Sequence, residues 1–581
     1  MSRGGPLAGR SAALALCLAI AAGSAANAQI FGLAHAPDSA SAFETARDAQ
    51  RDFERFRRTS LPKPIDDSRG TTCDAQIGRF CYWYAPPFDG PPPELPEVHD
   101  ARAALLRVLA DAAARSPTDG WVAGQRVRYL VEQGTPALAL TAARECQGVR
   151  WWCTALEGYA LHAAGDYAAA DSVYGVALLL MPESERCTWT DLSPLLDEDA
   201  GRYGKLTCDE RSAANRRIWW LARPLLAVPG NDLRTEHYAR LTLSRTLEGA
   251  ETPHGIAWGP DMRELTVRYG WPLGWSRAFP RPGSVEGPPV TGHERSPAFW
   301  FFPAAPLEPK PGEPARVVTW ELTRERPPAR YGPPYAGAFG TIERAQVARF
   351  RRGAGMQTVA GYDLTRDTTV SAGKLHVALA VSRDPETPPA VSDEAFVPAG
   401  AVSVASPWVP ALVSLEARDP ELRRAARVRA LLPAAPPVGG LSVSDLLLFR
   451  PAPDQAARRV DAVLPAPLFS SVVPQGTSVG LYWETYGANP SQPLRIEVRA
   501  QRGDGDGLPS PFGLAGCAPP GETPLRIAWE EPPPGRTRGA GRSVVADLSR
   551  LGPGRYVLAV AVAAPGGDPV CAGREVEITR R

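Results

Sequence analysis

The chain has 581 residues, and its 64 basic and 63 acidic side chains leave a net charge of +1. This balance provides no overall field that would attract nucleic acid or an anionic membrane, so we expect neither as a partner. The length exceeds what one hydrophobic core can organise and predicts several domains.

The first 28 residues have the pattern of an export signal. Arg3 and Arg10 supply positive charge, residues 12–22 are apolar, and Ala26-Asn27-Ala28 provides a small-x-small cleavage site. The apolar stretch is too short for a permanent anchor, and no later segment approaches a spanning length. We therefore expect an exported protein, periplasmic or extracellular, with no transmembrane segment after cleavage.

Nine cysteines are present, and Cys17 lies inside the predicted signal. The remaining eight are even in number, which favours disulfides in an exported protein. Metal ligation is the alternative, but no pair has two intervening residues and no histidine lies at ligand spacing, so we expect no metal. The predicted bridges join neighbours along the chain: Cys73 to Cys81, Cys146 to Cys153, Cys187 to Cys208, and Cys517 to Cys571.

The mature N-terminal region, residues 29–97, has two predicted parts. A helix over residues 40–58 carries a thin stripe of phenylalanines and should pack on another element. The second part, residues 73–84, places Tyr82-Trp83-Tyr84 beside a cysteine pair. It predicts a small disulfide-stapled core, with an exposed stacking platform as the alternative.

Residues 98–250 show a helical, alanine-rich pattern. One part resembles a tetratricopeptide repeat, in which small residues lie where two helices touch, aromatic side chains fill the gap and a proline closes the second helix. The matching positions are Gly158, Gly165, Tyr167, Ala170, Tyr174, Ala177 and Pro182. Thr154 and Glu157 replace the usual tryptophan and leucine. The resemblance implies a concave surface that binds proteins or peptides.

A repeat hairpin cannot bury its apolar face alone, so neighbouring helices must stack on it. The candidates are residues 100–116 and 211–226. In this arrangement Trp219 and Trp220 would be core residues.

Residues 251–281 contain a second motif, Trp258-Gly-Pro-Asp261 followed by Arg268-Tyr269-Gly270-Trp-Pro272. It resembles the GWxTD motif of secreted bacterial proteins, in which a tryptophan and an aspartate precede a short strand that ends in Arg-Tyr-Gly-x-Pro. Ala257 and Pro260 stand where the motif has glycine and threonine. The resemblance implies no settled activity. We expect Asp261 to cap a turn, and Trp258, Trp271 and Trp275 to form a plug between the helical and β parts.

The C-terminal half predicts β structure. A proline- and glycine-rich linker over residues 282–314 precedes short strand-like runs separated by turn residues. These runs favour two β-sandwiches of immunoglobulin or fibronectin type, at residues 315–455 and 460–581. The expected fold is therefore a multidomain α + β chain, with a tetratricopeptide-like helical domain followed by two β-sandwich domains.

No motif predicts catalysis or a cofactor. Gly476-Thr-Ser478-Val-Gly480 matches a nucleophile elbow by letter, but a strand follows it and no histidine lies downstream. Asp504-Gly-Asp506 resembles the start of a calcium loop whose later ligands are absent. The acidic run around residues 191–199 predicts a solvated face, with a cation site as the alternative.

We therefore expect a non-catalytic interaction or scaffold protein that binds a protein or peptide through its helical repeats. One alternative is glycan binding by exposed β-sandwich aromatics such as Trp483, Tyr486 or Trp529. A further alternative is a hydrolase with residues such as His254 and Asp261 in a cleft between the helical and β parts.

Overall fold

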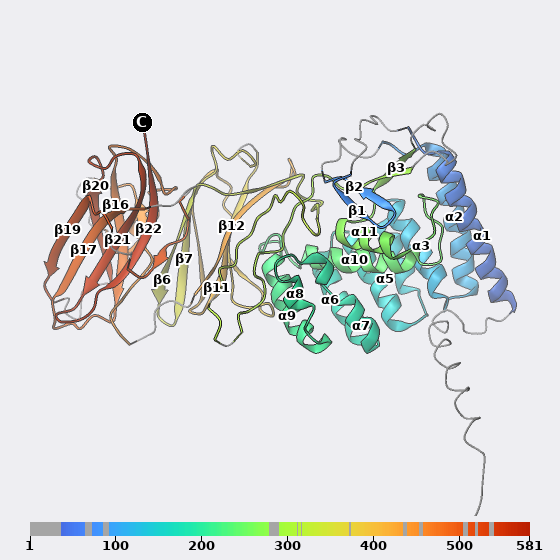
Figure 1. Cartoon of the computed structure of the whole chain (residues 1–581), viewed down its shortest axis with the longest axis horizontal. Helices are drawn as coiled ribbons and strands as arrows, with labels where there is room; N and C mark the ends of the chain where they lie inside the picture. Colours follow the sequence, from blue (N-terminus) through green and yellow to red (C-terminus); the bar gives the residue numbers. More distant parts are fainter. Residues whose placement is uncertain are drawn as a thin grey trace, which may run out of the picture. The chain divides into compact units, whose positions relative to one another are not determined.

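The structure is a computed structural model of the whole chain. It describes residues 37–63, 73–84, 92–277, 290–310, 312–314, 316–370, 373–433, 439–452, 457–503, 509–517, 521–533 and 540–580. The predicted export signal and the calcium-like Asp504-Gly-Asp506 lie outside these residues. Helices form the N-terminal half and β-sheets the C-terminal half, as expected (Figure 1). No helix in the described part of the chain is long and apolar enough to cross a membrane.

The chain divides into two compact units. The first comprises Met1–Trp189 and Arg234–Glu294, and the second comprises Thr190–Leu233 and Arg295–Arg581. Helical segments therefore occur in both units, while the long strands belong to the second.

The first unit is mainly helical. Its helices are α1 (Pro37–Thr59), α2 (Pro96–Arg115), α3 (Gly120–Glu132), α4 (Pro136–Arg144), α5 (Arg150–Ala163), α6 (Tyr167–Leu180), α7 (Glu183–Trp189), most of α10 (Asp232–Leu247) and α11 (Pro260–Tyr269). Two short hairpins complete it, β1 (Ala75–Ile77) with β2 (Phe80–Tyr82) and β3 (Gly274–Arg277) with β4 (Val290–His293).

Local sequence explains where helices α3 and α6 begin and where α3 and α5 end. The Asp119 carboxylate accepts hydrogen bonds from the first amides of α3, and the Asp166 carboxylate accepts one at the start of α6. Gly134 and Gly165 follow α3 and α5 with φ of +77° and +81°, a left-handed conformation that glycine adopts without strain. These signals produce two consecutive helical hairpins.

Helix α10 packs along the hairpin helices and is buried along most of its length. The Gln125 amide on α3 donates to the Thr246 carbonyl at 2.6 Å, and the Tyr174 hydroxyl on α6 lies 3.4 Å from that of Thr242. The hairpins therefore cover their apolar face with a later helix of the same chain.

The two predicted stacking partners have different locations. Helix α2 packs in the first unit, where Leu105 and Leu109 share a core with Phe53 and Trp121. Residues 211–226, however, lie in the second unit. There Trp220 Nε1 donates to Ser382 Oγ at 2.7 Å, and the Trp219 ring lies 5.6 Å from that of Phe302. Both tryptophans are core residues, as expected.

Charged side chains of a β-sheet in the second unit explain why residues 223–227 pack against that sheet. Arg429 donates to the carbonyls of Arg223 and Pro224 at 2.7 and 3.0 Å. Glu416 accepts from the backbone amides of Leu226 and Ala227. The chain that leaves helix α9 (Cys208–Ala222) thus has its polar backbone satisfied by a β-sheet.

The second unit contains two β modules. The first β module has a sheet of order β10-β7-β6 and a sheet of order β5-β12-β11-β8-β9, and both contribute to one core. Its strands are β5 (Ala338–Thr341), β6 (Ala345–Arg352), β7 (Gly355–Asp363), β8 (His376–Ser382), β9 (Ala390–Val391), β10 (Ala399–Pro407), β11 (Ala411–Asp419) and β12 (Arg424–Leu432).

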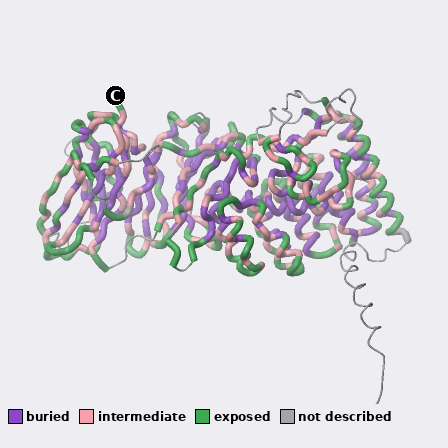
Figure 2. The backbone as a smooth tube through the Cα atoms, viewed as in Figure 1, coloured by how far each residue is buried: buried purple, intermediate pink, exposed green. Residues whose placement is uncertain are grey.

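The second β module is built in the same way, with β16 paired to β13, β14 and β20, and a larger sheet of order β15-β22-β21-β17-β19 to which β18 adds. Its strands are β13 (Ser442–Val443), β14 (Leu447–Phe449), β15 (Val472–Pro474), β16 (Ser478–Tyr486), β17 (Leu494–Arg502), β18 (Leu514–Ala515), β19 (Leu525–Glu531), β20 (Gly541–Asp547), β21 (Gly554–Ala563) and β22 (Val570–Thr579). Figure 2 shows buried backbone along the inner strands of both modules.

Three short elements remain, α8 (Ala200–Tyr203) and two 3₁₀ turns, Ser193–Leu195 and Val460–Ala462. Part of the predicted linker is also structured, because residues 290–293 form β4. Trp300, Phe301 and Phe302 are buried in the second unit.

The second β module covers the open edge of β6 in the first. Three alternate amides of β6, those of Val347, Arg349 and Arg351, donate to acceptors of the second module. These acceptors are the Pro511 carbonyl (2.7 Å), the Asp445 carboxylate (3.0 Å) and the Tyr486 hydroxyl (2.9 Å). An uncovered edge strand would leave these groups unpaired. The bonds therefore fix the two modules to each other.

Candidate functional site

All eight predicted structural cysteines are in disulfides. The bonds Cys73–Cys81, Cys146–Cys153 and Cys517–Cys571 join the pairs expected from the sequence. Cys187 and Cys208 are also disulfide-bonded. In the described ranges, no group of three or more His, Cys, Asp or Glu residues is arranged to hold a metal ion.

The GWxTD-like segment binds the disulfide-stapled hairpin of β1 and β2. Arg79 Nε and Nη2 donate to the two carboxylate oxygens of Asp261 at 2.6 and 2.7 Å, and the Arg79 amide adds a third bond at 3.1 Å. These hydrogen bonds hold the pKa of Asp261 well below its usual range. A Cβ atom at Gly78 would lie 2.4 Å from Asp261 Cβ, so only glycine permits this approach.

Tyr269 makes the second contact between these segments. Its ring stacks on Tyr82 with centroids 3.9 Å apart, and its hydroxyl lies 3.2 Å from that of Tyr84. Arg268 donates to the Tyr269 hydroxyl at 2.8 Å. Burial raises the pKa of Tyr269. Asp261, Arg268 and Tyr269 thus act together in anchoring the stapled hairpin.

The backbone of the motif differs from the expected short strand, because residues 260–269 form helix α11. Pro260 occupies its first turn, a position where proline costs no hydrogen bond. Gly270 ends the helix with φ of +99°, and Pro272 lies against Gly292 of β4. The helix has Gly259 as its N-cap, so Asp261 lies within the first turn instead of capping it, and its carboxylate accepts from the adjacent Met262 amide at 2.9 Å.

The three tryptophans of the segment contact one another. Ring centroids lie 6.2 Å apart for Trp258 and Trp271, and 5.6 Å apart for Trp271 and Trp275. His254 packs edge-on against Trp271, and burial lowers the pKa of His254 to about 4. Asp261, which we considered as its catalytic partner, is occupied by Arg79. The geometry therefore gives no support to a His254–Asp261 pair.

Two hydroxyl–imidazole pairs were not anticipated. Ser276 Oγ lies 2.8 Å from His293 Nε2, and His162 lies 2.9 Å from Thr235 Oγ1 and 2.7 Å from Glu236 Oε2. Such pairs resemble a nucleophile with its base. Ser276 and Thr235 are both 0% exposed, however, so a substrate cannot reach either oxygen. The pairs therefore satisfy buried polar groups.

A buried charge network joins α1 to α3. Glu54 Oε1 accepts from Arg128 at 3.0 Å and from the Tyr129 hydroxyl at 2.6 Å, while Arg57 donates to Glu132 at 2.7 Å. Burial would raise the pKa of Glu132, but Arg57 and Arg128 lower it to about 2. The charges are mutually neutralised, which fits a structural role.

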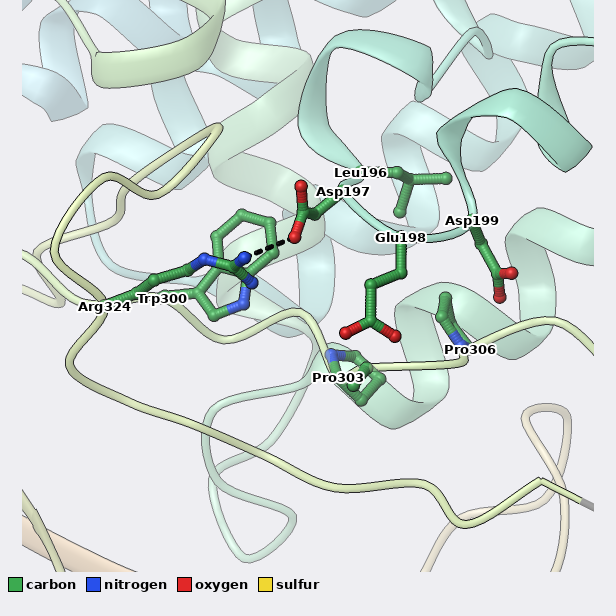
Figure 3. Close-up of a pocket in the computed structure, with 9 residues that line it drawn as sticks. Leu196, Asp197, Glu198, Asp199, Trp300, Pro303, Pro306 and Arg324 are labelled. Atoms are coloured by element: carbon green, nitrogen blue, oxygen red, sulfur yellow. Dashed lines mark ion pairs between the residues drawn. The ribbon is translucent and has the colours of Figure 1, made fainter.

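The acidic run lines a small pocket with room for about one water (Figure 3). Asp197 forms an ion pair with Arg324 at 2.5 Å, and the buried Asp199 pairs with Arg316 at 2.6 Å. Arginines thus neutralise two of its three carboxylates. Asp191, outside the pocket, pairs with Arg211 at 3.1 Å.

The repeat positions make the contacts expected of a helical hairpin. A Cβ atom at Gly158 would lie 2.9 Å from the ring of Tyr174, and Ala170 and Ala177 are fully buried. Tyr167 is buried at the start of α6, and Pro182 lies just beyond its end.

The outer face of α6 is exposed and apolar. Leu179 is 81% exposed and Val176 is 48% exposed, and Ala168 and Ser172 continue the same face. We call these four residues the α6 stripe. The Ser172 hydroxyl donates to the Ala168 carbonyl at 3.1 Å, so the stripe presents no charge.

The aromatic residues considered for glycan binding do not form a shared exposed platform. Trp483 is 0% exposed, and the half-buried Trp529 packs on the same core with ring centroids 6.4 Å apart. The Tyr486 hydroxyl donates to Glu484 at 2.7 Å.

No protein-family model matches the chain, and no curated protein sequence matches it. Among solved structures, it is similar to the crystal structure of chicken CNTN1 FN1-FN3 domains. The alignment covers 42% of this chain and 68% of that chain, with 10% sequence identity and a TM-score of 0.15. A score this low carries no argument about fold or function.

Proposed function

We propose that this chain is an exported, non-catalytic interaction protein that binds a protein partner through the α6 stripe. The observation that carries the proposal is the exposure of Leu179 and Val176 on a helix face without charge. Asp171, the acidic residue of α6, pairs with Arg234 at 2.5 Å and so adds no free charge. A helix that is apolar on both faces normally packs on both.

The partner that fits is an amphipathic helix of another exported protein. Such a helix lays its apolar residues, spaced three and four apart, along a matching face. Ala168 and Ser172 are small enough to let a second backbone approach, while Val176 and Leu179 provide the apolar anchor.

The tetratricopeptide resemblance supports this class of function. Repeat hairpins of that family bind proteins, and terminal hairpins need a neighbour or a polar cap on their outer face. Helix α10 already contacts Gln125 and Tyr174, on the side where the resemblance would put a concave surface, so we place the partner on the outer face. The two β modules, which we interpret as immunoglobulin- or fibronectin-like sandwiches, would serve as a rigid spacer.

Export is part of the proposal. It rests on the signal-like first 28 residues and on eight cysteines that are all in disulfides.

The test uses the oxidised full-length protein with Val176→Glu and Leu179→Glu combined. Cross-linking in periplasmic extract or culture medium should give a defined complex with the wild type and lose it with the double variant. The control is Thr141→Glu with Leu273→Glu, which adds the same charge at exposed positions of α4 and the GWxTD-like segment. Hydrogen exchange in the complex should slow at residues 168–180. A complex that both double variants form equally would refute the proposal.

A further inference from the structure

A pocket lies where the two β modules meet, beside the covered edge of β6. Its volume is about 590 Å³, counting the part open to solvent, so a ligand there would remain partly exposed. Arg351 and Trp408 line it from the first module, and Ser442, Tyr486, Leu514 and Ala572 line it from the second. Both modules belong to the same compact unit.

Two arginines line the pocket, and the charge of one of them is not neutralised by any residue that the structure describes. Arg349 and Arg351 lie two residues apart on β6, so their side chains share a face. Arg349 is occupied, since its Nε donates to Asp445 at 2.8 Å and its Nη1 to the Pro433 carbonyl at 2.9 Å. In Arg351 only the Nε atom of the side chain donates a hydrogen bond, to the Gly353 carbonyl at 3.1 Å. Its two Nη atoms have no partner among the described residues.

The backbone of Arg351 is held in place. Its amide donates to the Tyr486 hydroxyl, which in turn donates to Glu484. In the sheet register, Met356 pairs with both Arg351 and Ser406, which puts Arg351 and the end of β10 at the same end of the sheet. Trp408 follows two residues after Ser406. A guanidinium and an indole are thus brought to one pocket by the strand pairing.

The other walls complete this chemistry. Ser442 is 8% exposed, and its hydroxyl has no hydrogen-bond partner in the part of the chain that the structure describes. Leu514 and Ala572 supply apolar surface. Among the described residues that line the pocket, the unused polar groups are thus the planar guanidinium of Arg351, the Ser442 hydroxyl and the indole N–H of Trp408, which is buried without a hydrogen-bond partner. This set suits a ligand with a carboxylate, hydroxyl groups and a flat face.

We propose that this pocket binds a sugar acid, a pyranose ring that carries a carboxylate. The Nη1 and Nη2 atoms of Arg351 bind the two carboxylate oxygens, a geometry that arginine provides and lysine does not. The indole of Trp408 packs against the C–H face of the ring, and Ser442 hydrogen-bonds a ring hydroxyl. A peptide tail shares the carboxylate but lacks the C–H face of a sugar ring that would pack on the indole, so it is included below as a competing ligand.

The test titrates the oxidised full-length protein with galacturonate and, as the neutral counterpart, galactose, by calorimetry. Galacturonate should bind at least about tenfold more tightly than galactose, because a hydrogen-bonded charge pair is lost with the neutral sugar. Arg351→Gln should lower the affinity for galacturonate by about tenfold or more. Arg495→Gln removes the same charge from an exposed position of β17 and should leave its affinity unchanged.

Several results would overturn the proposal. These are no galacturonate binding at its solubility limit, equal binding of galactose, or unchanged affinity in Arg351→Gln. If N-acetyl-dialanine binds more tightly than galacturonate and depends on Arg351, the site takes a peptide carboxylate and the sugar assignment is wrong. Should Arg351→Gln fail to fold, Arg351→Lys keeps the charge without the fork and should still weaken galacturonate severalfold, and an unchanged affinity in that variant would refute the proposal.

Discussion

Arg79 and Asp261 are 182 residues apart in sequence, yet the guanidinium of one binds both carboxylate oxygens of the other at 2.6 and 2.7 Å. The pair explains why two unrelated-looking segments, a disulfide-stapled hairpin and a GWxTD-like motif, occur in the same unit. The hairpin is too short to fold alone, and the motif helix supplies the surface on which it packs.

We predict that Asp261→Asn releases the hairpin of β1 and β2. An amide cannot accept from both nitrogens of Arg79, so hydrogen exchange at residues 75–82 should accelerate and the Cys73–Cys81 bond should be reduced faster by a small thiol. Asp111→Asn is the matched control, because it removes a carboxylate of the same unit that pairs with Arg115 at an exposed site of α2. Equal exchange in the two variants would contradict this role for Asp261.

The same pair predicts a pH dependence. The pKa of Asp261 is lowered in the folded protein, chiefly by hydrogen bonds from Arg79, against about 4 in an unfolded chain. The stabilisation is therefore complete above about pH 4 and is lost as the pH falls toward the folded pKa. Protection of residues 75–82 should decline in that acidic window in the wild type. Asp261→Asn should not show this decline, and a decline above pH 5 would point to another group.

The change from helices in the N-terminal half to sheets in the C-terminal half could be predicted from the sequence, and so could the cysteine pairs whose bonds are described, because both depend on short-range spacing. The Arg79–Asp261 bond could not, since nothing local links residues so far apart. Helix α10 was also missed as a central element. Its buried Thr235, His237 and Ser244 hide the apolar periodicity that usually marks a core helix. Likewise, Arg351 and Trp408 come together only through strand register.

Arg128 should contribute strongly to stability. It is 0% exposed and paired with Glu54, which is also 0% exposed, so Arg128→Met leaves a buried carboxylate without its main cation. Removing one partner of a buried pair costs about 3–5 kcal/mol. Arg126→Met, which breaks a pair with the half-exposed Glu145, should cost less than about 1 kcal/mol. Denaturant unfolding of both variants measures the difference in the free energy of unfolding. If Arg128→Met loses as little as Arg126→Met is expected to lose, the network is dispensable.

Two glycines of the helical hairpin should respond in opposite directions to alanine. At Gly158 a Cβ atom would lie 2.9 Å from the Tyr174 ring, so Gly158→Ala should destabilise the protein by about 1–3 kcal/mol through overpacking. At Gly175, in the interior of α6, a Cβ atom meets nothing within 4 Å, and Gly175→Ala should stabilise it by about 0.5–1 kcal/mol. Thermal unfolding distinguishes the two, and a gain at Gly158 would exclude close packing of α5 on α6.

Arg574 should hold the two β modules together. Its guanidinium is fully buried and donates to the carbonyls of Leu446 (2.8 Å), Pro511 (2.7 Å) and Val347 (2.6 Å), the last of which belongs to β6. Arg574→Met leaves these three carbonyls without their donor. Each carbonyl that stays buried and unpaired should lower the stability by roughly 1–3 kcal/mol.

The expected result is a loss of at least about 2 kcal/mol and faster exchange of the β6 amides that face the second module. Arg495→Met, on an exposed position of β17, should change stability by less than about 0.5 kcal/mol. Because residues of both modules line the sugar-acid pocket, Arg574→Met should also weaken galacturonate binding, although Arg351 itself is unchanged. If the β6 amides stay as protected as in the wild type, the edge is held by its own three hydrogen bonds and Arg574 only fills the core.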